Sequence, residues 1–286
     1  MTFRFIDEHR DRFPVRVLCG VLGVSRSGYY AHRRRPVSAR ARRREELAAE
    51  IARVHAQHRR VYGSPRVHRA LLAGGRAVCR NTVARVMKSL GIKARTHRRF
   101  RVRTTDSAHA CPVAANTLDR RFRVRELDRV WVSDITYIPT GEGFLYLAAV
   151  MDLCSRRIVG WSMGATLQAS LACEAFTMAV RGRRPPRGLL HHSDRGVQYA
   201  CAQYRRLLEL HGVEMSMSRA GDCYDNAVQE SFWGKLKTEL VHHEHFATRD
   251  RARAAIFDYI EVFCNRRRMH STLGYLSPEQ FEARRR

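Results

Sequence analysis

The stretches VWVSDITYI at residues 130–138 and FLYLAAVM at residues 144–151 decide the fold of this chain. The first is rich in β-branched and aromatic residues, and the segment from Pro139 to Gly143 supplies a turn, so we expect two consecutive strands. The second stretch is apolar throughout, which is typical of a strand buried on both faces. The centre of the second half of the chain is therefore predicted to be a β-sheet.

Strands and helices alternate after this pair of strands. Residues 157–163 complete a three-stranded meander, and short strands are expected at 189–193 and 213–217. Amphipathic patterns predict the intervening and following helices, at 168–181, 199–211, 226–240 and 249–267. The resulting order, β-β-β-α-β-α-β-α, predicts an α/β fold with a mixed five-stranded sheet and helices on its faces.

The first hundred residues have helical patterns instead. Residues 14–35 predict a helix, a tight turn at Gly23, and a second helix capped by Ser25 and beginning at Arg26. The linker RRRP at 33–36 leads to a second helical block, with helices at 41–57, 64–72 and 81–90. Both blocks have the outline of a helix-turn-helix, a motif that binds DNA. A plain helical hairpin with a solvated basic face is the alternative.

Positive charge is concentrated in this helical part. The 286 residues include 53 Lys and Arg against 27 Asp and Glu, a net charge of +26. Residues 1–110 hold 27 of the basic and only 7 of the acidic residues. Such an excess favours a polyanionic partner, and we expect the helical part to bind nucleic acid.

Several classes of protein are excluded by the same sequence. The longest apolar run has eight residues, far short of a membrane span, and no secretory signal is visible. The eight cysteines are scattered without a C-x-x-C pair, which argues against a disulfide scaffold or a structural zinc site. We therefore expect a cytoplasmic protein with no membrane partner.

Three acidic residues are candidates for chemistry. Asp134 lies inside an apolar strand, where an unpaired carboxylate is costly, and Asp194 follows the short strand 189–193. Glu230 lies on the helix after the last strand, and Asn226, Trp233 and Lys237 share its face. Three converging carboxylates suit Mg²⁺, which prefers oxygen ligands. Two such ions about 3.5–4 Å apart would support an in-line displacement at a phosphoryl group. Lys237 would then contact the DNA backbone.

Other roles are open for these and neighbouring acids. Each candidate could instead pair with an arginine or remain a solvated surface group. Asp152 is expected to be a turn residue rather than a ligand. Asp222 and Asp225 are expected to cap the helix that carries Glu230, because negative charge at a helix N-terminus interacts favourably with the helix dipole.

The order and spacing of these motifs resemble a known family. The 35 residues between Asp194 and Glu230 match the DD(35)E pattern of DDE transposases and retroviral-type integrases. Further blocks match the second open reading frame of the IS3 family of insertion sequences, over nearly the whole chain. These blocks are GVSRSGYY at 23–30, YGSPR at 62–66, WVSDITY at 131–137, HSDRGVQY at 192–199, DNAVQESFWGKLK at 225–237 and YIEVFCNRRRMHSTLGYLSP at 259–278.

The resemblance implies an RNase H-like integrase core that uses Mg²⁺ or Mn²⁺, two ions per site, to cut DNA and transfer strands. Asp134 would contact both ions, and Asp194 and Glu230 would each complete one site. Arg26 and Arg66 lie in matching N-terminal blocks and are expected to contact DNA. The partners implied are double-stranded DNA at element ends and target, further copies of the chain, and an upstream open-reading-frame product or frameshift fusion, at the nucleoid.

The domain organisation expected from these patterns has five parts. They are a helix-turn-helix segment at 1–40, a second helical DNA-binding segment at 41–100, an exposed basic linker at 101–125, the catalytic core at 126–240 and a helical extension at 241–286. Two other functions stay open at this point. A non-catalytic helix-turn-helix regulator would need no metal, and an RNase H-type nuclease would cut DNA without joining it.

Overall fold

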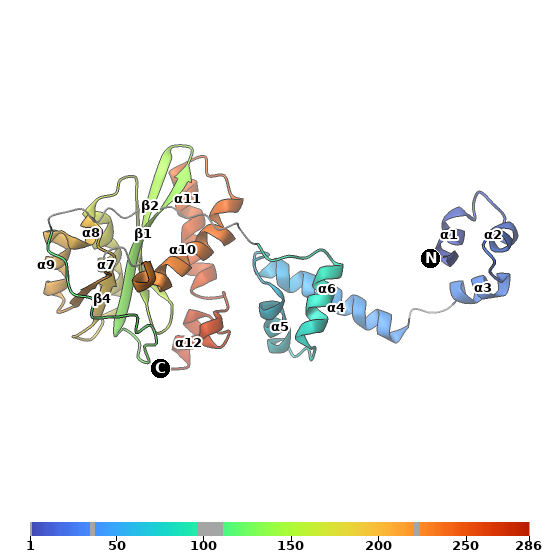
Figure 1. Ribbon diagram of the computed structural model, residues 1–286, viewed down its shortest axis with the longest axis horizontal. Coiled ribbons are helices and arrows are strands. Elements are labelled where there is room, and N and C mark those ends of the chain that lie inside the picture. The colour runs from blue at the N-terminus through green and yellow to red at the C-terminus, as the bar shows by residue number, and fades with distance from the viewer. Residues whose placement is uncertain (1, 35–37, 96–110, 220–222, 286) are drawn as a thin grey trace. The chain divides into compact units, whose positions relative to one another are not determined.

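The computed structural model describes residues 2–34, 38–95, 111–219 and 223–285. The chain divides into two compact units, Met1–Arg53 and Val54–Arg286. Helix α4 (Ala39–Gln57) begins in the first unit and ends in the second. Each unit has its own set of helices, coloured blue in the first and cyan to red in the second (Figure 1).

The first unit is a small helical cluster, to which the sequence had assigned only two helices before residue 36. It contains α1 (Thr2–His9), α2 (Val15–Val21) and α3 (Arg26–Arg34). Its core is formed by Ile6, Leu18, Cys19 and Tyr29. The Ser25 hydroxyl accepts a hydrogen bond of 3.0 Å from the Gly28 N–H, which confirms the predicted N-cap of α3.

The second unit begins with two further helices and contains the sheet. The helices are α5 (Ser64–Ala73), with Pro65 in its first turn, and α6 (Arg80–Ser89). The five strands lie in the order β3-β2-β1-β4-β5. They are β1 (Val130–Thr140), β2 (Gly143–Asp152), β3 (Ile158–Gly164), β4 (Leu190–Ser193) and β5 (Glu214–Met217). Strands β1, β2 and β3 pair antiparallel, and β4 pairs parallel with β1 and β5.

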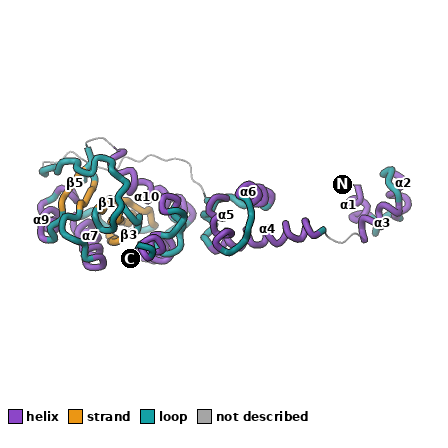
Figure 2. Tube along the Cα trace, turned by 90° about the horizontal axis from the view of Figure 1, so that it is seen from below, coloured by secondary structure: helices purple, strands orange, loops and turns teal. Residues whose placement is uncertain are grey.

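Helices cover both faces of this sheet. On one side lie α7 (Ala169–Arg183), α8 (Val197–Ala200) and α9 (Ala202–Leu210), and on the other lie α10 (Ala227–Glu239) and α11 (Arg249–Phe257) (Figures 1 and 2). A Cβ atom at Gly160 of β3 would stand 2.2 Å from the Ala175 carbonyl oxygen, so only glycine allows α7 to pack this closely. The predicted α/β fold, with a mixed five-stranded sheet and helices around it, is confirmed.

The C-terminal part contains short helical pieces. The helix expected at 249–267 ends at Phe257 and continues as a π-helix, Asp258–Cys264. The other pieces are the 3₁₀ turns Cys223–Asn226, Val241–His243 and Ser271–Leu273, and α12 (Pro278–Ala283). A complete capping box formed by Ser277 and Gln280 begins α12.

The linker expected at 101–125 is only partly within the described residues, which resume at 111. Most residues of its described part are exposed and belong to no helix or strand, as the sequence predicted. Leu118 is buried, and the N–H groups of Thr117 and Leu118 donate to the Ser216 hydroxyl at 3.0 and 3.3 Å. Leu118 is the exception, because its apolar side chain and the N–H donors beside it attach this point of the segment to β5.

Candidate active site

Pairing of β1 with β4 brings Asp134 and Asp194 to the same level of the sheet. The two strands run parallel, and Val132 lies opposite His192. Side chains two residues apart in a strand point to the same face, and each aspartate stands two residues beyond this pair. Strand β4 ends at Ser193, so Asp194 lies just past its carboxyl end, where the Gly196 N–H donates to it at 3.0 Å. The two carboxylates are neighbours on adjacent strands.

Asp134 is held by neutral donors. The Ile135 N–H donates to Oδ1 at 2.8 Å, and the indole N–H of Trp233 donates to Oδ2 at 2.9 Å. Burial raises the pKa of Asp134 well above its usual value, the carboxylates of Asp194 and Glu230 raise it further, and the two donors lower it. A half-buried acid that lies near two other acids forms the kind of site that a cation would stabilise.

Glu230 lies in the first turn of α10 and its side chain is exposed. Partial burial of the carboxyl group raises its pKa, and its charge also reaches Asp134. Among the residues that the structure describes, however, no three His, Cys, Asp or Glu side chains lie close enough to hold a metal ion together. The fold thus brings two acids together and places the third on a neighbouring helix.

Helix α10 lies along β1 through three contacts that surround Glu230. The Asn226 side chain donates to the Ser133 carbonyl at 3.4 Å, Trp233 donates to Asp134, and the Lys237 ammonium lies 4.7 Å from the centre of the Tyr137 ring. Burial lowers the pKa of Lys237, while the Asp134 charge raises it. The predicted face is therefore the face of α10 that meets β1, through Asn226, Trp233 and Lys237.

The two arginines expected to contact DNA differ in their surroundings. Arg26 is exposed at the first residue of α3. Arg66, in the first turn of α5, is half-buried, and its Nε donates to the Met269 carbonyl at 3.0 Å. Its guanidinium also lies 5.7 Å from the centre of the Tyr62 ring. Arg66 therefore joins α5 to the C-terminal segment, a role that its sequence motif did not reveal, and DNA contact by either arginine stays a prediction.

Asp225 requires a correction. It lies in the 3₁₀ turn before α10 and does not cap that helix, whose N-cap position is Asn226. Its buried carboxylate accepts hydrogen bonds from Arg219, Arg120 and Asn116, and the bonds from Arg219 are the main reason why its pKa is lowered. The expected capping role is wrong for Asp225, because its carboxylate oxygens are taken up by these side-chain donors and by the Arg219 N–H. Asp222 lies outside the described residues.

Asp152 has the turn role that the sequence predicted. Its carboxylate accepts from the N–H and hydroxyl of Ser155 at 2.6 and 2.9 Å and from the Asp128 N–H at 2.7 Å. These bonds close the turn after β2.

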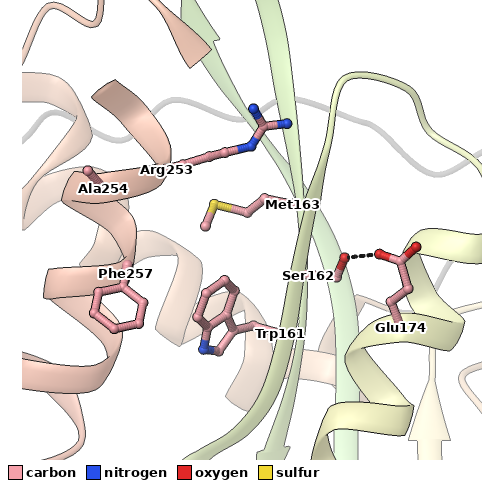
Figure 3. Close-up of a pocket in the computed structure, with 7 residues that line it drawn as sticks. All are labelled: Trp161, Ser162, Met163, Glu174, Arg253, Ala254 and Phe257. Carbon is pink, nitrogen blue, oxygen red and sulfur yellow. Dashed lines mark hydrogen bonds between the residues drawn. The ribbon is translucent and has the colours of Figure 1, made fainter. Parts of the chain in front are cut away.

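A cavity of about 480 Å³ lies elsewhere, between β3, α7 and α11 (Figure 3). Its lining includes the Ser162 hydroxyl, which donates to Glu174 at 2.6 Å, and the ring of Trp161 facing Phe257. None of the three candidate acids lines this cavity. It is therefore separate from the acid site.

Comparison with known proteins identifies the segments and their relatives. Residues 125–223 and 230–285 each match a family model described as an integrase core domain, and residues 42–100 match an HTH-like domain. The transposase InsF for insertion sequence IS3A of Escherichia coli (strain K12) is 42% identical over 284 residues, which cover 99% of this chain and 98% of that protein. The insertion element IS600 uncharacterized 31 kDa protein of Shigella sonnei is 46% identical over 264 residues, covering 92% and 97%.

One solved structure that matches this chain is the simian T-cell lymphotropic virus intasome in complex with PP2A regulatory subunit B56 gamma. The match has a TM-score of 0.48 and 14% sequence identity, and it covers 81% of this chain and 73% of that chain. Within the described residues, no helix is both long and apolar enough to span a membrane. The near full-length identity to transposases, together with the integrase core on which the acids lie, shows that this chain belongs to the IS3 family of DDE transposases.

Proposed function

We propose that this chain is the catalytic subunit of a DNA transposase, which cuts a DNA strand and joins the freed 3′-OH to a second strand, with Asp134, Asp194 and Glu230 as its catalytic acids. The observation that carries this assignment is the placement of the acids. Asp134 lies in β1, and Asp194 follows the neighbouring parallel strand β4 at the same level of the sheet. Helix α10, which carries Glu230, packs along β1.

The donor set fits a hard divalent cation. Carboxylate oxygens are what Mg²⁺ and Mn²⁺ prefer, and the repulsion that raises the pKa of Asp134 is what a cation would relieve. Asp134 would contact two ions, and Asp194 and Glu230 would each hold one. When bound, such ions activate the attacking hydroxyl and stabilise charge on the leaving oxygen.

The chain's own residues prepare this site. Trp233 and the Ile135 N–H fix the Asp134 side chain, and Lys237 lies beside the acids, where its ammonium would contact a DNA phosphate. The exposed side chain of Glu230 has room to turn toward the two aspartates when metal and DNA enter. Together these residues supply a fixed pair of carboxylates and an adjustable third.

The rest of the proposed protein delivers DNA to this site. The basic segments 1–40 and 41–100 would bind double-stranded DNA at the element ends, the linker 101–125 would join them to the core at 126–240, and 241–286 would support it. Two element ends must be held together, which calls for a homo-oligomer, assisted by an upstream open-reading-frame product. Its DNA substrate would place this assembly in the cytoplasm, at the nucleoid.

The test is a strand-transfer assay on labelled duplexes that carry element ends, with Mg²⁺, Mn²⁺ or EDTA. Wild type is compared with Glu230→Gln and with Glu209→Gln, which alters an exposed glutamate of α9 as a matched control. We expect joined products from wild type and the control in metal, and a loss of about 1,000-fold or more in Glu230→Gln, because several kcal/mol of transition-state stabilisation depend on the ions. Each variant is run with and without the upstream product.

Two outcomes would contradict the proposal. Cleavage without joining in every mixture would indicate an RNase H-type nuclease. Tight DNA binding with no chemistry under any condition would indicate a regulator.

A further inference from the structure

We propose that Trp233 is a positioning residue for the metal site, acting through the hydrogen bond from its indole N–H to Asp134. This inference rests on the proposed function, since it concerns the same acids. It assigns a role to a side chain that is neither acidic nor a candidate ligand. The bond joins α10, which carries Glu230, to β1, which carries Asp134.

The chemistry of the indole suits this task. An indole N–H is a donor without charge, so it occupies one position on the carboxylate and leaves the other lone pairs for a cation. A lysine or arginine at the same place would neutralise Asp134 and compete with the metal. Groups that hydrogen-bond to a metal-binding side chain without touching the metal fix the orientation of that side chain. Their loss typically weakens metal binding about 10- to 100-fold.

The geometry supports a fixed donor. Trp233 is 6% exposed and its ring packs 5.0 Å, between centroids, from that of Phe232. The bond to Asp134 Oδ2 is 2.9 Å long, while the Ile135 N–H holds the other oxygen at 2.8 Å. Both carboxylate oxygens of Asp134 are thus oriented by the protein before any ion arrives.

Trp233 also links the two acids that differ most in their surroundings. Glu230 stands one helical turn before Trp233, on the same face of α10. The indole bond is therefore the contact between α10 and β1 that acts directly on the Asp134 carboxylate, beside those of Asn226 and Lys237. Loss of the bond should disturb the orientation of Asp134 and the approach of Glu230 together.

The chain offers a matched control in Trp161. Its indole N–H also donates to a carboxylate, Glu261 Oε1, at 2.8 Å, and its ring lines the cavity of Figure 3, away from the acids. Replacement by phenylalanine at either position removes one indole–carboxylate bond and keeps an aromatic ring. Only the change at 233 touches Asp134.

The experiment measures Mn²⁺ binding to the full chain, by the loss of the electron paramagnetic resonance signal of free Mn²⁺ and by calorimetry. Wild type, Trp233→Phe, Trp161→Phe and Asp134→Asn are compared. We expect Trp161→Phe to bind as wild type does, Trp233→Phe to bind about 10-fold more weakly, and Asp134→Asn to lose the site.

The outcomes separate the two proposals. Equal Mn²⁺ affinity in Trp233→Phe and wild type, with loss in Asp134→Asn, would overturn the positioning role and leave the proposed metal site intact. Wild type without Asp134-dependent Mn²⁺ binding would overturn the metal assignment itself. If Trp233→Phe does not fold, benzothienylalanine at position 233 replaces only the N–H by sulfur, and wild-type affinity in that protein would overturn the role.

Discussion

Buried and half-buried acids among the described residues fall into two groups that differ in what surrounds them. Asp225 and Glu239 face arginines: Asp225 accepts from Arg219 and Arg120, and Glu239 accepts two hydrogen bonds from the buried Arg268. Asp134 accepts only from the N–H groups of Ile135 and Trp233 and lies in the field of further carboxylates. The chain has 53 lysines and arginines, so cations are not scarce.

The difference indicates which acids stabilise the fold. An arginine beside a buried carboxylate balances its charge within the fold, and such a pair needs nothing more. Asp134 is bonded to neutral N–H groups, and although the Lys237 ammonium acts on it through space, its pKa is still raised, as is typical of functional sites. Asp152 also has neutral donors, but those from Ser155 close a turn and the Asp128 N–H binds the other oxygen; burial raises its pKa, and the Asp128 carboxylate adds to this only as the last cause. Removal of charge should therefore have opposite effects in the two groups.

The largest effect on stability is expected at the Glu239 pair. Arg268→Met would leave Glu239 buried with only the Tyr259 hydroxyl, which donates to it at 2.8 Å, at a cost of about 3–5 kcal/mol. The melting temperature should fall by roughly 10 °C in calorimetry. Adding Glu239→Gln should recover part of the loss, because no charge is then buried alone.

The control for this variant is Arg206→Met, which alters an exposed arginine of α9. If Arg268→Met melts at the same temperature as Arg206→Met, the pair contributes nothing measurable, and the distinction between the two groups of acids fails at its strongest member.

The sequence could predict the sheet because its strands are marked by apolar and β-branched runs with turns between them. It could also place Asp134 inside one strand and Asp194 at the end of another, as the structure has them. The hydrophobic pattern and the chain order are local properties, and local properties are what a sequence displays directly.

Contacts between distant segments could not be predicted in this way. Arg66 lies in a basic motif, which suggested DNA, yet its partner is the Met269 carbonyl about two hundred residues later. Asp225 lies at the start of a helix, which suggested the dipole, yet its partners come from the linker and from Arg219. Trp233 was placed on the correct face of α10, but only the structure shows that its N–H reaches Asp134.

A smaller loss is expected from Asp225→Asn. The amide keeps the shape of the side chain but removes the charge that faces two half-exposed arginines, at a cost of about 2 kcal/mol at pH 7. The pKa of Asp225 is lowered in the folded protein, so its stabilising effect is present above the ordinary Asp pKa of about 3.9 and is lost as the pH falls below it. Urea unfolding at pH 7 and pH 3 measures this.

The control is Asp119→Asn, which removes an exposed partner of Arg219 and should change stability little. A deficit in Asp225→Asn that is as large at pH 3 as at pH 7 would show that packing, rather than charge, stabilises this site.

The smallest effect has the opposite sign. Asp134→Asn removes a charge that burial and two neighbouring acids disfavour, so the variant should be more stable than metal-free wild type at pH 7. Because the folded pKa is above the unfolded one, wild type has its full stability below pH about 3.9 and loses it as the pH rises through the folded pKa. The gain in stability of Asp134→Asn over wild type should therefore appear only above pH about 3.9.

Thermal unfolding in EDTA, from pH 3 to pH 8, measures this gain, and the same series with Mn²⁺ tests its cause. Mn²⁺ should stabilise wild type and leave Asp134→Asn unchanged, because a ligand stabilises only the folded state that binds it. Asp225→Asn should lose stability in EDTA and still respond to Mn²⁺, since its acid lies among arginines. A destabilised Asp134→Asn at pH 7 would mean that Asp134, like Asp225, is balanced within the fold, and the contrast between the two groups of acids would no longer hold.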